Sequence, residues 1–314
     1  MKIVVGIDIG GTKTKLGLVC KKGLTHIETS FPTTDYPLID DFIKHLSKTI
    51  SDLLNDKFEL LGIGIGAPNA SSKNGTIENA ANLKWKGVVE VVEKLNVYFD
   101  IPIKIMNDAS AAALGEKIFG SAKEMDDFIT ITLGTGLGGG IVANGKLIDG
   151  FDGFAGELGH IDITLGDGRL TGLGVKGGLE AYVSVTGIKR TVYHMLCKYT
   201  EASILREYSY KELDGETIYK AALDGDFIAQ KTYNYTGKVL GGALANFVAF
   251  TQPEAIFLTG GLLKSGVLLL EPTRKHLEKN LLQVYKGKVK LLESGLTDRN
   301  PAVLGAASLI WNEN

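Results

Sequence analysis

The sequence predicts an α/β protein of two domains, and three observations carry that prediction. Apolar strand patterns alternate with helical patterns, such as a strand over 60–66, a helix over roughly 87–96 and a strand over 101–106, which is typical of a parallel or mixed sheet covered on both faces. The chain has 314 residues, of which 44% are hydrophobic and 22% charged, and this is enough for two domains. A strand, a glycine turn and a second strand occur near the N-terminus and again near residue 130, so the two domains are expected to share an architecture.

The first of these hairpins spans residues 4–19. An apolar run that carries Asp8 leads into the turn Gly10-Gly11-Thr12-Lys13, and a second apolar run follows it. Glycines let backbone N–H groups close around an anion, while a hydroxyl and an ammonium group add further donors. We therefore expect the turn to bind phosphate and Asp8 to hold a metal ion. Considered alone, the turn is equally well explained by the need of a hairpin for glycine.

The second hairpin, over residues 128–142, has the turn Gly134-Thr135-Gly136. Thr132 stands where Asp8 stands in the first hairpin, so the second turn is expected to donate hydrogen bonds but not to hold a metal. Two unequal phosphate-binding turns fit one nucleotide in one cleft. Gly260-Gly261 follows a later predicted strand, and glycines there would let a flat purine ring approach closely.

Helical spacing of apolar residues predicts the remaining helices, which cover 39–54, 109–118, 240–250 and a C-terminal segment that begins at Pro301. The helix over 109–118 is expected to be capped by Asn107 or Asp108 and to close the first domain. We therefore expect a smaller N-terminal α/β domain over 1–118, a larger C-terminal one over 119–299, and a C-terminal helix, about 300–314, that packs back on the first.

Composition excludes several classes of function. The net charge is −2 and no basic run exceeds the pair Lys21-Lys22, which argues against a nucleic-acid partner. No uninterrupted apolar stretch reaches ~18 residues, so no membrane partner is expected. The chain enters a strand directly after its first residues, without a signal-like segment, so a cytoplasmic location is expected. Cys20 and Cys197 are far apart in sequence and are expected to be buried, small apolar residues.

Six short motifs occur in a fixed order along the chain. They are Asp8-x-Gly10-Gly11-Thr12-Lys13, Asn107-Asp108 before an Ala-rich helix, Leu133-Gly134-Thr135-Gly136-x-Gly138, Gly156-Glu157-Leu158-Gly159-His160, Gly177-x-Leu179-Glu180 and Thr259-Gly260-Gly261. Over essentially the whole chain this order resembles the ROK family of sugar kinases and sugar-responsive repressors, and within it the bacterial glucokinases. The resemblance implies a two-domain actin-like, ribonuclease-H-like ATPase fold with ATP and a sugar in the interdomain cleft. The family's repressors carry a helix-turn-helix before the first turn, and here only Met1-Lys2-Ile3 stands there.

The resemblance implies ATP-dependent phosphorylation of a hexose, with glucose converted to glucose 6-phosphate, and ATP and Mg²⁺ as nucleotide and metal. It also implies a homo-oligomer, a dimer, whose partners are otherwise a small hexose and a nucleotide. Other readings remain open. They are a kinase for another hexose, such as an N-acetylhexosamine or fructose, a glucokinase that uses polyphosphate, and a sugar sensor without catalysis.

Phosphoryl transfer to a hydroxyl needs a proton acceptor, and the motif order assigns that role to Asp108. An isolated Asn-Asp pair would more often be only a helix cap. The resemblance assigns sugar binding to Asn82, Asn107, Asp108, Glu157, His160 and Glu180. It assigns phosphate and nucleotide binding to Asp8, Gly10, Gly11, Thr12, Lys13, Gly134, Thr135, Gly136, Gly260 and Gly261, with Asp8 holding Mg²⁺ directly or through water.

The chain departs from its family in one loop. Many ROK proteins bind a structural zinc there through three cysteines and a histidine, but Thr171, Leu173 and Gly178 stand at the cysteine positions here. None of them supplies a thiolate, so a Cys₃His site cannot form. We therefore expect no zinc, a loop held by packing alone, and a His160 that is left to the sugar.

Overall fold

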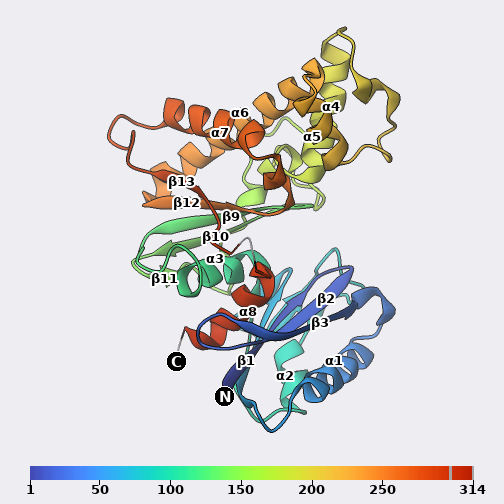
Figure 1. Ribbon diagram of the computed structural model, residues 1–314, viewed down its shortest axis with the longest axis vertical. Coiled ribbons are helices and arrows are strands. Elements are labelled where there is room, and N and C mark those ends of the chain that lie inside the picture. Colours follow the sequence, from blue (N-terminus) through green and yellow to red (C-terminus); the bar gives the residue numbers. More distant parts are fainter. Residues whose placement is uncertain (297–298, 313–314) are drawn as a thin grey trace. The chain divides into compact units, whose positions relative to one another are not determined.

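The computed structural model describes residues 1–296 and 299–312, which contain two five-stranded sheets (Figure 1). The chain divides into two units: the first comprises Met1–Asp126, Gly140–Gly156 and Ser294–Asn314, and the second Asp127–Gly139 and Glu157–Glu293. The domain limits expected from the sequence, 1–118 and 119–299, stay a prediction. Residues 297–298 of the second domain and 313–314 of the expected C-terminal helix lie outside the described residues.

The sheet of the first unit is mixed, as predicted. Its order is β3-β2-β1-β4-β8, in which β1 runs antiparallel to β2 and parallel to β4, and β4 runs parallel to β8. The strands are β1 (Lys2–Ile9), β2 (Lys13–Val19), β3 (Thr25–Pro32), β4 (Glu59–Ala67) and β8 (Ile103–Asn107). Because β1, β4 and β8 are parallel, their carboxyl ends meet at one edge of the sheet.

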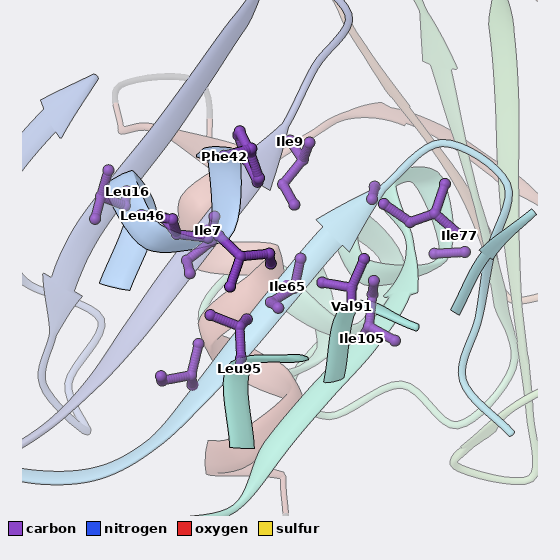
Figure 2. Close-up of a cluster of buried hydrophobic side chains, with 14 of the residues drawn as sticks. Ile7, Ile9, Leu16, Phe42, Leu46, Ile65, Ile77, Val91, Leu95 and Ile105 are labelled. Carbon is purple, nitrogen blue, oxygen red and sulfur yellow. The ribbon is translucent and has the colours of Figure 1, made fainter. Parts of the chain in front are cut away.

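One face of this sheet is covered by α1 (Ile39–Leu53) and α2 (Val91–Asn96). Every second side chain of β1, including Ile7 and Ile9, packs against Phe42 and Leu46 of α1 and Leu95 of α2, as Figure 2 shows. This alternation is what a strand with one face toward each helical layer requires. Burial of these aliphatic and aromatic side chains gives the first unit its main core.

The helix predicted over 87–96 begins later, at Val91. Gly87 has a φ of 77°, which cannot continue into a helix. The next two residues form β7 (Val88–Val89), which pairs with β6 (Thr76–Glu78); β6 also pairs with β5 (Ala70–Ser71) in a small separate sheet. The expected start of the helix was therefore wrong by about one turn.

The opposite face of the sheet is covered by α3 (Asp108–Ile118) and α8 (Pro301–Trp311), which also contact each other (Figure 1). The sheet presents glycines to α8, and this brings the helix backbone close to the strands. A Cβ on Gly6 would collide with the carbonyl oxygen of Val303, and one on Gly64 with that of Ala306. We call Gly6, Gly17, Gly62 and Gly64 of β1, β2 and β4 the glycine face.

The second sheet has the order β11-β10-β9-β12-β13, with β12 parallel to both β9 and β13. Its strands are β9 (Phe128–Leu133), β10 (Leu137–Ala143), β11 (Lys146–Leu147), β12 (Ala255–Thr259) and β13 (Lys290–Glu293). The helices of the second unit are α4 (Val185–Lys198), α5 (Gly215–Leu223), α6 (Phe227–Thr251) and α7 (Val267–Asn280). The helix predicted over 240–250 is the last part of the longer α6. None of the described helices combines the length and apolarity needed to cross a bilayer.

The two cysteines differ in burial. Cys20 is buried, as predicted, but Cys197 is exposed, so that prediction was wrong. Cys197 lies near the end of α4, whose buried side chains include Ile188, Val192 and Met195. A helix face repeats every three or four residues, and Cys197 falls between these repeats.

Candidate active site

Two carboxyl groups lie at the carboxyl edge of the first sheet. Asp8, near the end of β1, pairs with Gly66 of β4, and Ala67 of β4 pairs with Asn107 at the end of β8. The Cα atom of Asp108 lies 3.6 Å from the position that a Cβ on Gly66 would take. Asp8 and Asp108 therefore lie on either side of a residue without a side chain, where open α/β sheets bind their ligands.

Burial acts on both carboxyl groups, and neighbouring charges act on Asp8. The pKa of Asp8 is raised from 3.8 to about 6, chiefly by desolvation and also by the charge of Asp108, while the charge of Lys15 opposes the shift. The Asp108 side chain is accessible to water at its surface. The protein atoms around it nevertheless desolvate the carboxyl group and raise its pKa, and hydrogen bonds from the Ala109 and Asp108 N–H groups only partly offset this rise. Two crowded carboxyl groups at one strand edge favour a proton or a cation between them.

Lys15 is a site residue that the sequence motifs did not predict. It lies on β2 directly opposite Asp8 in the antiparallel ladder. Cross-strand partners in a hairpin project from the same face of the sheet, so the ammonium group acts on the Asp8 carboxylate. Counting back from the turn at residues 10–13 would have identified this pair from the sequence.

The start of α3 explains part of the Asn107-Asp108 motif. The Asn107 Oδ1 accepts hydrogen bonds from the N–H groups of Ala109 at 2.9 Å and Ser110 at 3.4 Å, so Asn107 is the N-cap. Asp108 Oδ1 accepts from the same Ala109 N–H at 2.8 Å. Capping therefore accounts for the asparagine. It gives the following carboxylate a fixed position at the helix start.

The first glycine turn is closed by its own backbone and lies against Asn82. The Gly10 N–H donates to the Lys13 carbonyl at 3.2 Å. A Cβ on Gly11 would collide with the Asn82 carbonyl oxygen, so glycine is required there by packing. The side chains of Thr12 and Lys13 are exposed. The structure thus places Asn82, predicted for the sugar, beside the turn predicted for phosphate.

The second glycine turn lies in the second unit and is tied to Glu180. The Leu137 N–H, directly after the turn, donates to Glu180 Oε2 at 3.0 Å. A Cβ on Gly136 would collide with the same carboxylate oxygen. The Val185 N–H donates to the Gly134 carbonyl at 2.9 Å, which fixes the turn to the start of α4. Gly260, with a φ of 103°, packs against the backbone of Leu133.

His160 and Glu180 lie in two short 3₁₀ turns that contact each other, η2 (Leu158–His160) and η3 (Leu179–Ala181), and Glu157 is the N-cap of η2. Nε2 of His160 lies 3.7 Å from Oε2 of Glu157. Nδ1 of His160 is buried and has no hydrogen-bond partner within residues 1–296 and 299–312. A buried ring nitrogen without a partner costs free energy in the unliganded protein.

The glycines of the predicted nucleotide site differ in the structural reason for having no side chain. Gly136 and Gly260 are required by close packing within the second unit. A Cβ on Gly134 or Gly261 would meet no described atom within 4 Å, and neither has a positive φ. Packing therefore explains the first pair but not the second, and leaves room at the second pair for a ligand to approach the backbone.

The loop without thiolates keeps an ordered course, but hydrogen bonds hold it as well as packing, so the expectation of packing alone was wrong. Thr171 is buried, and its Oγ1 accepts from the Val175 N–H at 3.1 Å. Gly178 packs against the Thr171 methyl group and pairs with Asp162 in an isolated bridge, while Leu173 is exposed. Within the described part of the chain, no three His, Cys, Asp or Glu side chains gather as a metal would require.

We expect purified protein to contain no stoichiometric zinc. The three residues at the thiolate positions supply no ligand, and one imidazole does not retain zinc against a chelator. Prolonged treatment with a chelator, followed by Mg²⁺, should leave activity unchanged. Elemental analysis that finds one zinc per chain, with activity lost on chelation and restored by zinc alone, would show that other side chains bind the metal.

Known proteins with similar sequences and structures share this architecture. The ROK family model matches residues 4–313, so the chain belongs to the ROK family. A glucokinase from Halalkalibacterium halodurans is 34% identical over 280 residues, which cover 87% of this chain and 84% of that protein. The crystal structure of a ROK family glucokinase from Streptomyces griseus in complex with glucose and AMPPNP matches with a TM-score of 0.81 and 31% identity, and covers 98% of both chains. A xylose repressor from Bacillus subtilis is 28% identical over 98% of this chain and 76% of the repressor. With these relatives, the mixed α/β units have the two-domain actin-like ATPase fold that the sequence predicts.

Proposed function

We propose that this chain transfers the γ-phosphoryl group of ATP to a hexose, converting glucose to glucose 6-phosphate. The observation that carries the substrate class is the likeness, over 98% of both chains, to a glucokinase solved with glucose and AMPPNP. The observation that carries the chemistry is the pair Asp8 and Asp108 at one strand edge. A repressor or sensor without catalysis has no need of two neighbouring carboxyl groups there.

Asp108 is the proposed general base. Its position at the start of α3 is fixed by the Ala109 N–H bond, and crowding raises its pKa toward the range in which a carboxylate accepts a proton well. The hydroxyl of the sugar would donate its proton to Asp108 as the oxygen attacks phosphorus. Asn107 and Asn82 are proposed to hold neighbouring hydroxyl groups.

Asp8 is the residue that would hold Mg²⁺, directly or through water. A desolvated carboxylate beside a second one fits this ion, which takes one or two carboxylates together with phosphates and water. When bound, Mg²⁺ neutralises charge on the phosphates of ATP. The donors proposed for the phosphates are the backbone, Thr12 and Lys13 of the first turn and Gly134-Thr135-Gly136 of the second. Gly260 and Gly261 would allow close approach of the purine.

Glu157, His160 and Glu180 are the proposed sugar ligands of the second unit. Carboxylates accept from hydroxyl groups, and an imidazole offers one donor and one acceptor. The short separation of 3.7 Å between His160 Nε2 and Glu157 Oε2 supports this role, because two polar groups so close together suit neighbouring hydroxyl groups of one sugar. Family resemblance further supports a cytoplasmic homodimer that acts in glycolysis, and these finer assignments are part of the proposal.

A panel of sugars and phosphoryl donors tests the proposal. We expect ADP release with ATP, Mg²⁺ and glucose, and at least about tenfold lower kcat/KM for fructose, N-acetylglucosamine and N-acetylmannosamine, because their C2 groups differ and a missing or misplaced partner leaves site groups unpaired. Polyphosphate in place of ATP should give little product. Equal turnover with an N-acetylhexosamine, or with polyphosphate, would reassign acceptor or donor. Binding of glucose without turnover under any of these conditions would favour a sensor.

A further inference from the structure

Arg169 lies in the loop between η2 and η3, the two turns with the proposed sugar ligands, and its environment is unusual for an arginine. Its side chain is half-buried, and no carboxylate in the described residues pairs with it. Desolvation lowers the pKa of Arg169, as expected for a partly buried cation that has no acidic partner nearby. Burying a charge in this way costs free energy unless other contacts offset it. The contacts of Arg169 therefore indicate what the residue does.

The hydrogen bonds and the ring contact of Arg169 are made with Tyr182 and with the first half of α4. The guanidinium carbon lies 4.7 Å from the centre of the Tyr182 ring, which is a cation–π distance. Nη1 donates to Oγ1 of Thr191 at 2.8 Å and to the carbonyl of Gly187 at 3.3 Å. The backbone N–H of Arg169 donates to the Tyr182 hydroxyl at 3.1 Å. The side chain and the backbone of Arg169 thus contact the ring and the hydroxyl of Tyr182.

Tyr182 in turn fixes the segment that carries Glu180. It is the C-cap of η3, and its N–H donates to the Leu179 carbonyl at 3.0 Å. The tyrosine is 7% exposed, and its backbone lies so close to Gly187 that a Cβ there would collide with it. Glu180 stands two residues earlier and accepts from the Leu137 N–H. A shift of Tyr182 would therefore move the Glu180 carboxylate relative to the second glycine turn.

We propose that Arg169 is a positioning residue for the sugar site: by clamping Tyr182 against α4, it holds the Glu180 carboxylate in place. The proposal rests on the proposed function in so far as Glu180 binds the sugar. Arg169 itself touches no reacting atom. Loss of the Arg169 side chain would let Glu180 move and would lower the affinity for the sugar. Asp8 and Asp108 of the first unit, on which the proposed metal and base chemistry depends, would be unaffected.

The test compares Arg169→Met with Arg169→Lys and with a matched control, Arg206→Met. Arg206 also donates to backbone carbonyls near the end of α4, including that of Tyr199 at 2.6 Å, but it does not contact the loop. We expect Arg169→Met to raise KM for glucose at least about tenfold, with a smaller rise in KM for ATP because Glu180 also contacts the second glycine turn. Arg169→Lys keeps a cation over the ring and should recover part of the affinity. Arg206→Met should leave KM for glucose unchanged.

A second readout does not depend on the sugar. Hydrogen exchange at the Leu137 amide reports the bond to Glu180 directly, and it should be about tenfold faster or more in Arg169→Met than in Arg206→Met. Unchanged exchange at Leu137, or equal losses of affinity for glucose and ATP, would overturn the positioning role. If the wild type neither binds nor phosphorylates glucose, the proposed function fails, and the exchange measurement still decides whether Arg169 holds Glu180.

Discussion

Asp108→Asn is expected to lower kcat by about 10²–10⁴-fold, with the affinity for glucose within a few-fold of the wild type. Asparagine keeps the shape and the oxygen that accepts from the Ala109 N–H, so the start of α3 should be preserved. What it lacks is a site for the proton of the attacking hydroxyl. A coupled assay of ADP release and calorimetric titration with glucose measure the two effects separately.

Asp41→Asn is the matched control for this experiment. Asp41 is an exposed carboxylate in the first turn of α1, in the same unit, and its replacement should leave kcat unchanged. An Asp108→Asn enzyme that turns over at the rate of the wild type would remove Asp108 from the role of general base. Loss of glucose binding together with kcat would instead assign Asp108 mainly to the sugar.

Asp8→Asn is expected to stabilise the protein without ligands near neutral pH while abolishing its use of ATP with Mg²⁺. The pKa of Asp8 is raised from 3.8 to about 6 in the folded state, so ionisation of this group opposes folding. Its contribution to stability is fully present below its unfolded pKa and is lost as pH rises through about 6. Two pKa units correspond to about 3 kcal/mol as an upper bound. Asparagine cannot ionise and avoids this cost.

Urea unfolding at about pH 4 and about pH 8 separates this effect from a general change in packing. The gain from Asp8→Asn should be about 1–3 kcal/mol at the higher pH and should nearly vanish at the lower one. Lys15→Met gives the opposite test, because loss of the ammonium group opposite Asp8 raises the pKa of the carboxyl further and should destabilise the protein at the higher pH. A variant Asp8→Asn that is less stable than the wild type at both values would contradict the assigned cause.

The fold was predictable where pattern and turn chemistry agree. The strand over 255–259 and the hairpin around residues 10–13 occur as expected, because a short apolar run specifies the first and turn glycines specify the second. The start of α2 was wrong because Val88 and Val89 pair with β6, a contact between strands that the spacing of apolar residues does not show. The burial of Cys197 was predicted wrongly because it was inferred from the residue type alone, which does not show which face of α4 is buried.

The candidate site was predictable as residue types but not as contacts. Motif order selected Asp108 and Glu180, yet no local pattern shows that Glu180 accepts from Leu137, 43 positions earlier in the chain. The clamp formed by Arg169 is of the same kind. An isolated arginine in a glycine-rich loop reads as a surface residue until the ring of Tyr182 is placed beneath it.

The glycine face gives the first unit a late step in its folding. Strands β1, β2 and β4 are synthesised early, yet the helix that covers their glycines begins at Pro301, after the entire second unit. The growing chain therefore carries these strands without α8 until the second unit has been synthesised. The first unit begins synthesis before the second and cannot complete its core until the last helix has been added, against the usual N-terminal order of folding during synthesis. A chain truncated before Pro301 would lack the helix backbone that packs against Gly6 and Gly64.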